Sequence, residues 1–181
     1  PSNCETEDDY VDHLINHIKE EFFLGVVAPE EIAAFIIEPV TGEGGFIVPP
    51  KRYMQELAKL CRQYGILLIV DEVQSGFCRT GKMFATEHFF EADYSGLGPD
   101  LITMAKSLSN GMPLSAVTGR KEIMDSVQEN GLGGTFCGNP ISCEAALATI
   151  NFMEKNKLAK RAEKIGKIVL ERFHQIQKHS K

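Results

Sequence analysis

The chain has 181 residues, enough to bury the core of one domain, and its 43% hydrophobic and 24% charged residues are typical of globular proteins. The formal net charge of -6 argues against a nucleic-acid or anionic-membrane partner, and no apolar run approaches the roughly 20 residues of a membrane span. Five scattered cysteines without a CxxC pair favour reduced thiols in the cytoplasm or an organelle matrix over a disulfide framework or a zinc site.

The first predicted element is a helix that begins near residue 6, where Thr6 and Asp8 are available as caps. Its apolar residues follow helical spacing, at Val11, Leu14, Ile15, Ile18 and Phe22. His13 and His17 lie four residues apart on this helix, as in a shared metal site, but the sequence offers them no third ligand and no HExxH motif. We therefore predict a solvated polar face there and no metal site.

The second predicted element is a buried strand at residues 33–37, which ends in the carboxylate of Glu38. A glycine-rich loop follows at residues 40–45. Such loops can bind phosphate through backbone N–H groups, but this one matches neither GxxxxGK[ST] nor GxGxxG. We expect its glycines to let the backbone turn sharply and to hold Glu43 toward a cavity.

A helix is predicted from Lys51 to Tyr64, with Gly65 placed to end it. The apolar run at residues 66–70 then predicts a strand buried on both faces, followed directly by Asp71 and Glu72. Residues 33–71 therefore form one βαβ unit, whose two strands end in carboxylates at the same sheet edge. Ligands of open α/β sheets bind at that edge. The alternative is that Asp71 and Glu72 merely end a core strand and face water.

A third apolar run, residues 101–105, follows a long irregular passage and ends at Lys106. Lys106 is either a surface lysine or a buried amine that forms a Schiff base with an aldehyde. Further along, the pattern predicts a fourth apolar run at residues 114–118 and a flexible segment at 131–135. Three helices are expected, at residues 121–127, 140–154 and 158–177.

Other chemistries find less support in the sequence. No GxSxG motif occurs, and no serine has an evident histidine partner. The strand that ends in Asp71 and Glu72 also resembles the magnesium-binding strand of P-loop ATPases. These residues contain no Walker A motif to accompany it.

Four ordered motifs carry a specific family resemblance: residues 37–45 (IEPVTGEGG), 70–81 (VDEVQSGFCRTG), 99–108 (PDLITMAKSL) and 133–140 (GGTFCGNP). Together they resemble the class III (ω-type) aminotransferases, pyridoxal-phosphate enzymes of fold type I, and above all the 4-aminobutyrate, ornithine and acetylornithine group. The resemblance implies an α/β fold in which a mostly parallel sheet has helices on both faces. Residues 1–155 would be part of the cofactor-binding large domain, and residues 156–181 a helix leading into a C-terminal small domain outside the chain.

The resemblance also implies roles for four residues near the cofactor. Lys106 would form the internal aldimine with pyridoxal 5'-phosphate and then move the proton during transamination. Asp71 would pair with the protonated pyridine nitrogen, so that the ring withdraws electrons. Val73 would pack on one face of the ring, and Gln74 would reach its phenolic oxygen.

Three further residues take roles from the resemblance. Thr135 would bind the cofactor phosphate of the neighbouring subunit, which makes a homodimer with shared active sites part of the mechanism. Glu43 resembles the gating glutamate that pairs with a substrate-binding arginine further along the chain. Glu38 would lie near the same site.

The chain also departs from the family pattern. Relatives are about twice as long, so we expect a central fragment of a longer protein. Cys78 replaces a usual glycine, Cys137 replaces a small residue, and residues 90–98 resemble a short insertion.

The function that follows is transfer of an amino group from an ω-amino or amino acid donor to a 2-oxo acid such as 2-oxoglutarate. Two alternatives stay open: an amino-acid racemase or aminomutase of the same family, and a catalytically silent fragment that acts as a structural partner.

Overall fold

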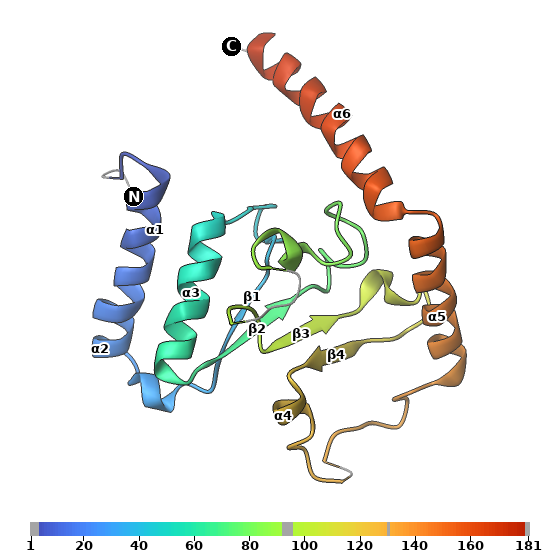
Figure 1. Ribbon diagram of the computed structural model, residues 1–181, viewed down its shortest axis with the longest axis horizontal. Coiled ribbons are helices and arrows are strands. Elements are labelled where there is room, and N and C mark those ends of the chain that lie inside the picture. The colour runs from blue at the N-terminus through green and yellow to red at the C-terminus, as the bar shows by residue number, and fades with distance from the viewer. Residues whose placement is uncertain (1–3, 92–95, 130, 180–181) are drawn as a thin grey trace.

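A computed structural model describes residues 4–91, 96–129 and 131–179. Its centre is a four-stranded sheet in the order β1-β2-β3-β4 (Figure 1). The strands are β1 Ala34–Ile37, β2 Leu67–Asp71, β3 Leu101–Met104 and β4 Ala116–Gly119. β1, β2 and β3 are parallel, and β4 pairs antiparallel with β3. The predicted α/β fold with a mostly parallel sheet is therefore confirmed.

The N-terminal helix α1, Glu7–Asn16, begins with a capping box. The Thr6 side chain accepts a hydrogen bond from the Asp9 backbone, and the Asp9 carboxylate accepts one from the Thr6 backbone. Thr6 is thus the predicted cap, but Asp9 rather than Asp8 completes the box. The helix continues through a π-helical segment at His17–Phe22 into α2, Phe23–Gly25.

His13 and His17 are both exposed on this helix. His17 Nδ1 lies 3.0 Å from a carboxylate oxygen of Glu21, which gives it a partner within its own helix. Across the described residues, no three His, Cys, Asp or Glu side chains gather as metal ligands. That a metal plays no part stays a prediction.

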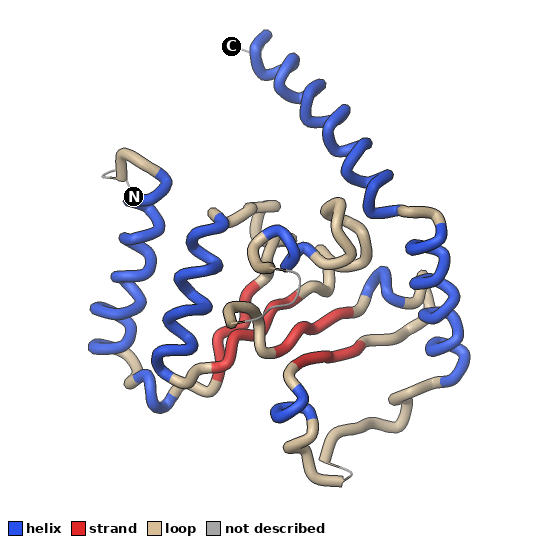
Figure 2. Tube along the Cα trace, in the orientation of Figure 1, coloured by secondary structure: helices blue, strands red, loops and turns tan. Residues whose placement is uncertain are grey.

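Helix α3, Lys51–Tyr64, ends at Gly65, which adopts the left-handed conformation at φ +70°, as predicted. It connects β1 to β2, whose parallel pairing confirms the βαβ unit. α3 buries Met54, Leu57, Ala58, Leu60 and Cys61 in the larger of two hydrophobic cores. That core also contains residues of α1 and of β2, so these two helices lie on one side of the sheet (Figure 2).

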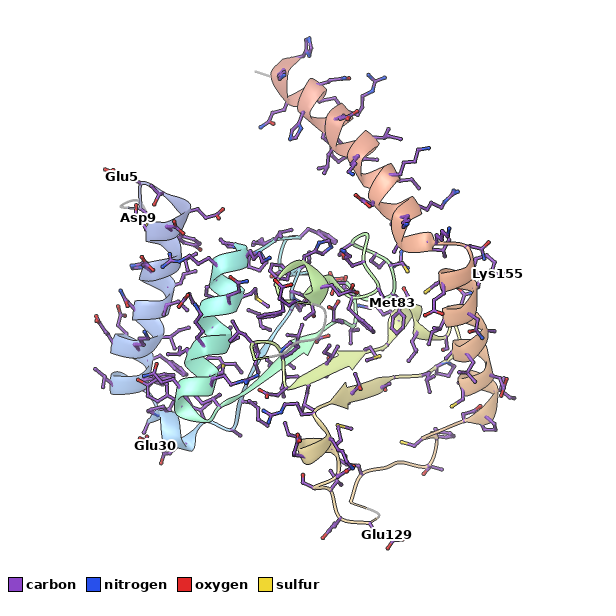
Figure 3. All side chains as sticks on the ribbon, viewed as in Figure 1. Glu5, Asp9, Glu30, Met83, Glu129 and Lys155 are labelled. Atoms are coloured by element: carbon purple, nitrogen blue, oxygen red, sulfur yellow. The ribbon has the colours of Figure 1, made fainter. Side chains whose placement is uncertain are left out.

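The smaller core includes residues of β3 and contains Phe77, Ile102, Met104, Leu108 and Ala146. Ala146 belongs to α5, Pro140–Lys155, and Met83, in the connection between β2 and β3, also packs here (Figure 3). The remaining helices are α4 Lys121–Met124, α6 Leu158–His179 and the 3₁₀ segments Pro29–Glu31, Ala85–His88 and Lys106–Leu108. In Figure 1, α6 projects away from the rest of the molecule.

The fold bears on two segments predicted from the sequence, the domain boundary at 155/156 and the insertion at residues 90–98. α5 ends at Lys155 and α6 begins at Leu158, next to the predicted domain boundary at 155/156, but the assignment of the two parts to domains stays a prediction. The predicted insertion at residues 90–98 lies partly outside the described residues, which omit 92–95.

None of the helices that the structure describes is both long and apolar enough to cross a bilayer.

Candidate active site

β2 ends in two adjacent carboxylates with different surroundings. Asp71 is half-buried, and its Oδ1 accepts a hydrogen bond of 2.9 Å from the backbone N–H of Val73. Glu72 is fully buried, with 0% of its surface exposed. The alternative in which both carboxylates simply face water is therefore wrong for Glu72.

The Glu72 carboxylate accepts four hydrogen bonds. Oε2 accepts from the Ser75 hydroxyl at 2.6 Å and from the Ala85 N–H at 3.1 Å. Oε1 accepts from the Thr86 N–H at 2.6 Å and from the Thr86 hydroxyl at 2.5 Å. Sequence reasoning missed this network, because three of its donors come from the 3₁₀ segment Ala85–His88, which carries no signal of contact with residue 72.

Lys106 follows β3 by two residues and begins the 3₁₀ segment Lys106–Leu108. The structure leaves the lysine exposed, whereas the Schiff-base interpretation expects a buried amine. The adjacent Ser107 is held by Arg79, whose Nε and Nη2 donate to the Ser107 hydroxyl at 3.1 Å and 2.9 Å. Arg79 lies in the 70–81 motif, but no pattern in the sequence indicated this contact.

A cavity of about 450 Å³ lies at the ends of β2 and β3. It is lined by Val40, Gly42, Phe46, Gln74, Ser75, Arg79, Thr80, Lys106 and Ser107. The structure therefore brings Lys106 and Gln74, two predicted site residues, to one cavity. Asp71 and Val73 are not among the lining residues, so a direct pairing of Asp71 and Lys106 across a ligand stays a prediction.

The predicted gating residues lie in the loop after β1. Glu38 Oε2 accepts a hydrogen bond of 2.7 Å from the Gly42 N–H, which closes the loop on itself. Glu43 is exposed, and its Oε1 accepts a bond of 3.3 Å from the Gln74 side chain. Glu43 thus reaches the cavity through Gln74 rather than lining it.

Gly42 is the point of closest approach between this loop and Gln74. A Cβ atom at residue 42 would lie 2.7 Å from Gln74 Cδ, closer than real Cβ contacts allow. Glycine is therefore needed for the loop to lie directly on the Gln74 amide.

Thr135 lies apart from these residues, in the exposed segment 131–139 before α5. Cys137 is exposed in the same segment. Cys78, which stands where the family pattern has a glycine, has φ +70°, a left-handed conformation that favours glycine. Burial raises the pKa of its thiol.

All of residues 1–181 match the family described as aminotransferase class-III. The chain belongs to the class-III aminotransferases. The resemblance stated from four motifs is thereby confirmed across the whole sequence.

Two curated aminotransferases show the level of similarity. The chain is 45% identical over 168 residues to the probable 4-aminobutyrate aminotransferase of Bacillus subtilis, covering 93% of this chain and 37% of the relative. It is 47% identical over 172 residues to the 5-aminovalerate aminotransferase of Pseudomonas aeruginosa, covering 95% of this chain and 38% of the relative. The chain thus spans little more than a third of these relatives.

Among solved structures, the chain resembles an amine transaminase from an uncultivated Pseudomonas species in its pyridoxal-phosphate-bound, internal aldimine form. The TM-score is 0.86 at 34% identity, and the match covers 99% of this chain and 40% of the other. Similarity at this level confirms fold type I, the fold of pyridoxal-phosphate transaminases, and pyridoxal phosphate is the cofactor of the family.

The residues that line the cavity suit that cofactor. The cavity offers a primary amine at Lys106 for an aldehyde and an amide at Gln74 for a ring oxygen. One hydroxyl nearby has no partner in the described residues: Thr103 Oγ1 is buried without a hydrogen bond, and Thr103 pairs with Asp71 across β2 and β3. Polar groups thus converge where the two strands end.

Proposed function

We propose that this chain is the central part of an aminotransferase that moves an amino group from an ω-amino or amino acid donor to a 2-oxo acid such as 2-oxoglutarate. The observation that carries the proposal is the cavity shared by Lys106 and Gln74 at the ends of adjacent strands in a class-III chain. Relatives named for 4-aminobutyrate and 5-aminovalerate favour a donor whose amino group is terminal.

When bound, pyridoxal phosphate supplies an aldehyde and an electron-withdrawing ring. Lys106 Nζ would hold the cofactor by condensing with that aldehyde, with loss of water, and as a free amine it would carry the proton that transamination moves. Asp71 would pair with the protonated ring nitrogen, a charge-assisted bond worth roughly 1.5–3 kcal/mol. Its existing bond to the Val73 N–H fixes the carboxylate for that role. Val73 would pack on the ring, and Gln74 would bind the phenolic oxygen.

We assign control of the amino donor's access to the site to the loop after β1. Glu43, which already contacts Gln74, is the gating carboxylate for the donor, and Glu38 keeps the loop closed through its bond to Gly42. The exposure of Thr135 supports a role toward the phosphate of a second subunit, and hence a homodimer. We assign the enzyme to the cytoplasm or an organelle matrix, a choice supported by its unpaired cysteines in the described residues.

The test is reduction of the full-length protein with borohydride in the presence of pyridoxal phosphate, followed by peptide mapping. We expect a pyridoxyl group on Lys106 alone, loss of that label in Lys106→Arg, and an unchanged label in Lys121→Arg. Lys121 is a suitable control because it is an exposed lysine shortly after a strand, paired only with Asp125 in the described structure. A label on any other lysine contradicts the assignment.

Product analysis separates the alternatives. A racemase or aminomutase converts a single amino acid without a 2-oxo acid, whereas the proposed enzyme needs both substrates. A catalytically silent partner develops no absorbance from bound cofactor when pyridoxal phosphate is added to the full-length protein.

A further inference from the structure

We propose that Glu72 is a positioning residue that holds the cofactor-binding segment 71–75 in place through its buried carboxylate. The inference rests on the proposed function, since it concerns the same site. Glu72 lies directly between Asp71 and the pair Val73 and Gln74, but it does not line the cavity.

The carboxylate connects two segments that are distant in sequence. Each oxygen accepts one backbone N–H and one hydroxyl: Oε2 from Ala85 and Ser75, and Oε1 from both donors of Thr86. Ser75 belongs to the cofactor-binding segment, whereas Ala85 and Thr86 begin the 3₁₀ segment Ala85–His88. The Glu72 carboxylate therefore links the cofactor-binding segment to the 3₁₀ segment by hydrogen bonds.

The backbone of Glu72 extends the same connection to β3. Its N–H donates to the Thr103 carbonyl at 2.9 Å, three residues before Lys106, and its carbonyl accepts from the Gly76 N–H at 2.9 Å. A Cβ at residue 76 would lie 2.9 Å from the Glu72 carbonyl oxygen. The turn from 72 to 76 thus has little freedom, and it carries Gln74 toward the cavity.

The pattern of donors requires a carboxylate rather than an amide. In Glu72→Gln, the new NH₂ group faces either the Ala85 N–H or the Thr86 N–H, and two donors cannot bond each other. The side chain must then move, although its size is almost unchanged.

A second buried carboxylate supplies a matched control. Asp100 is 4% exposed, accepts from the Leu68 N–H at 2.8 Å and from Arg120 at 2.9 Å, and lies at the opposite end of β2. Asp100→Asn also removes a buried negative charge and places an NH₂ group opposite the Leu68 N–H or the Arg120 guanidinium, far from residues 71–75. It therefore measures the effect of losing a buried carboxylate on folding alone.

The experiment compares wild type, Glu72→Gln, Asp100→Asn and Thr86→Val in the full-length protein. Thr86→Val removes only one hydroxyl donor and keeps the side-chain shape. Three quantities are measured: the melting temperature, the dissociation constant for pyridoxal phosphate with the absorbance of the bound form, and amide hydrogen exchange in residues 71–76 of the apoprotein.

We expect Glu72→Gln and Asp100→Asn to lower the melting temperature similarly. Of these two variants, only Glu72→Gln should weaken cofactor binding, by at least tenfold, and speed exchange in residues 71–76 by a similar factor. Thr86→Val should weaken binding about threefold, and this variant decides the question if Glu72→Gln does not fold.

An unchanged dissociation constant in Glu72→Gln, or in Thr86→Val where that variant decides, overturns the inference, as does equal weakening in Asp100→Asn. Failure of the proposed function looks different, because wild type then takes up no pyridoxal phosphate at Lys106. The exchange measurement on the apoprotein still applies in that case. Unaltered exchange in Glu72→Gln rejects the positioning role, and faster exchange supports it.

Discussion

Gly42 and Gly76 both lack room for a side chain, but for different reasons. At Gly42 the obstacle is the far end of the flexible Gln74 side chain, whereas at Gly76 it is the backbone carbonyl of Glu72. A side chain can rotate away at small cost, and a backbone cannot. The two glycines therefore differ in what must move to admit a Cβ atom: the Gln74 side chain at Gly42, and the backbone of the turn at Gly76.

We predict that Gly42→Ala displaces Gln74 and weakens binding of pyridoxal phosphate several-fold, while stability changes by less than about 1 kcal/mol. Gly76→Ala should instead destabilise the fold by about 1–3 kcal/mol through overpacking. Cofactor titration and urea unfolding of both variants check this. A loss of stability in Gly42→Ala as large as in Gly76→Ala counts against it.

For single residues, the sequence indicates which reactive side chains follow the strands, but not which groups surround those side chains. Asp71 and Lys106 follow buried runs, so their place at the sheet edge could be predicted. Three of the four donors to Glu72 come from 13 and 14 residues further along, and no periodicity encodes that contact. The exposure of Lys106 also escaped prediction, because a strand end is compatible with either burial or exposure.

Among the elements, α3 and its end at Gly65 follow from local rules. The amphipathic spacing over residues 51–64 defines the helix, and Gly65 takes the left-handed conformation that ends it. A Cβ at Gly65 would meet nothing within 4 Å, so any effect of a substitution there is conformational.

We predict that Gly65→Ala lowers the free energy of unfolding by about 1 kcal/mol, the cost of placing an L-residue in the left-handed region. Gly25→Ala is the matched control. It has equal space around its Cβ but lies in a helix without a positive φ, so alanine should leave stability unchanged or raise it slightly. Equal losses of stability in the two variants would argue against a conformational cause.

Elements that depend on a partner were harder to predict. The sequence showed an apolar run at residues 114–118, and the structure has β4 at Ala116–Gly119, whose antiparallel direction is set by pairing with β3. All four residues of β4 are exposed, so hydrogen bonding to β3 rather than burial holds it in the sheet. α4 ends at Met124 rather than near residue 127, since a single turn of helix carries too little periodicity to fix its end.

For the molecule as a whole, a buried thiol in the larger core contributes to how stability depends on alkaline pH. Cys61 is 1% exposed in this core, and burial, assisted by the negative charge of Asp100, raises the pKa of its thiol from 9.0 to about 11. Between these values the unfolded thiol ionises while the folded one keeps its proton. The contribution to stability is therefore fully present below pH 9 and is lost as the pH rises toward 11.

We predict that the free energy of unfolding falls between pH 9 and pH 11 by about 1 kcal/mol per pH unit from this thiol alone. Urea unfolding at a series of pH values measures the slope. Cys61→Ala should reduce the slope, although it also lowers stability at neutral pH through lost packing. Cys137→Ala, at an exposed cysteine, should retain the wild-type slope, and an identical slope in all three proteins contradicts the prediction.

The alternation of side chains along β2 has a consequence for how this segment tolerates changes in length. Leu68, Val70 and Glu72 are buried, whereas Ile69 and Asp71 are only half-buried, so even and odd positions serve opposite sides of the sheet. Deleting or inserting a single residue before Asp71 would exchange the sides of the sheet that Asp71 and Glu72 face. Glu72 would then point toward the ligand, and Asp71 would point into the interior. Deleting or inserting two residues would leave Asp71 and Glu72 on the sides of the sheet that they occupy now. Only their position along the strand direction would change.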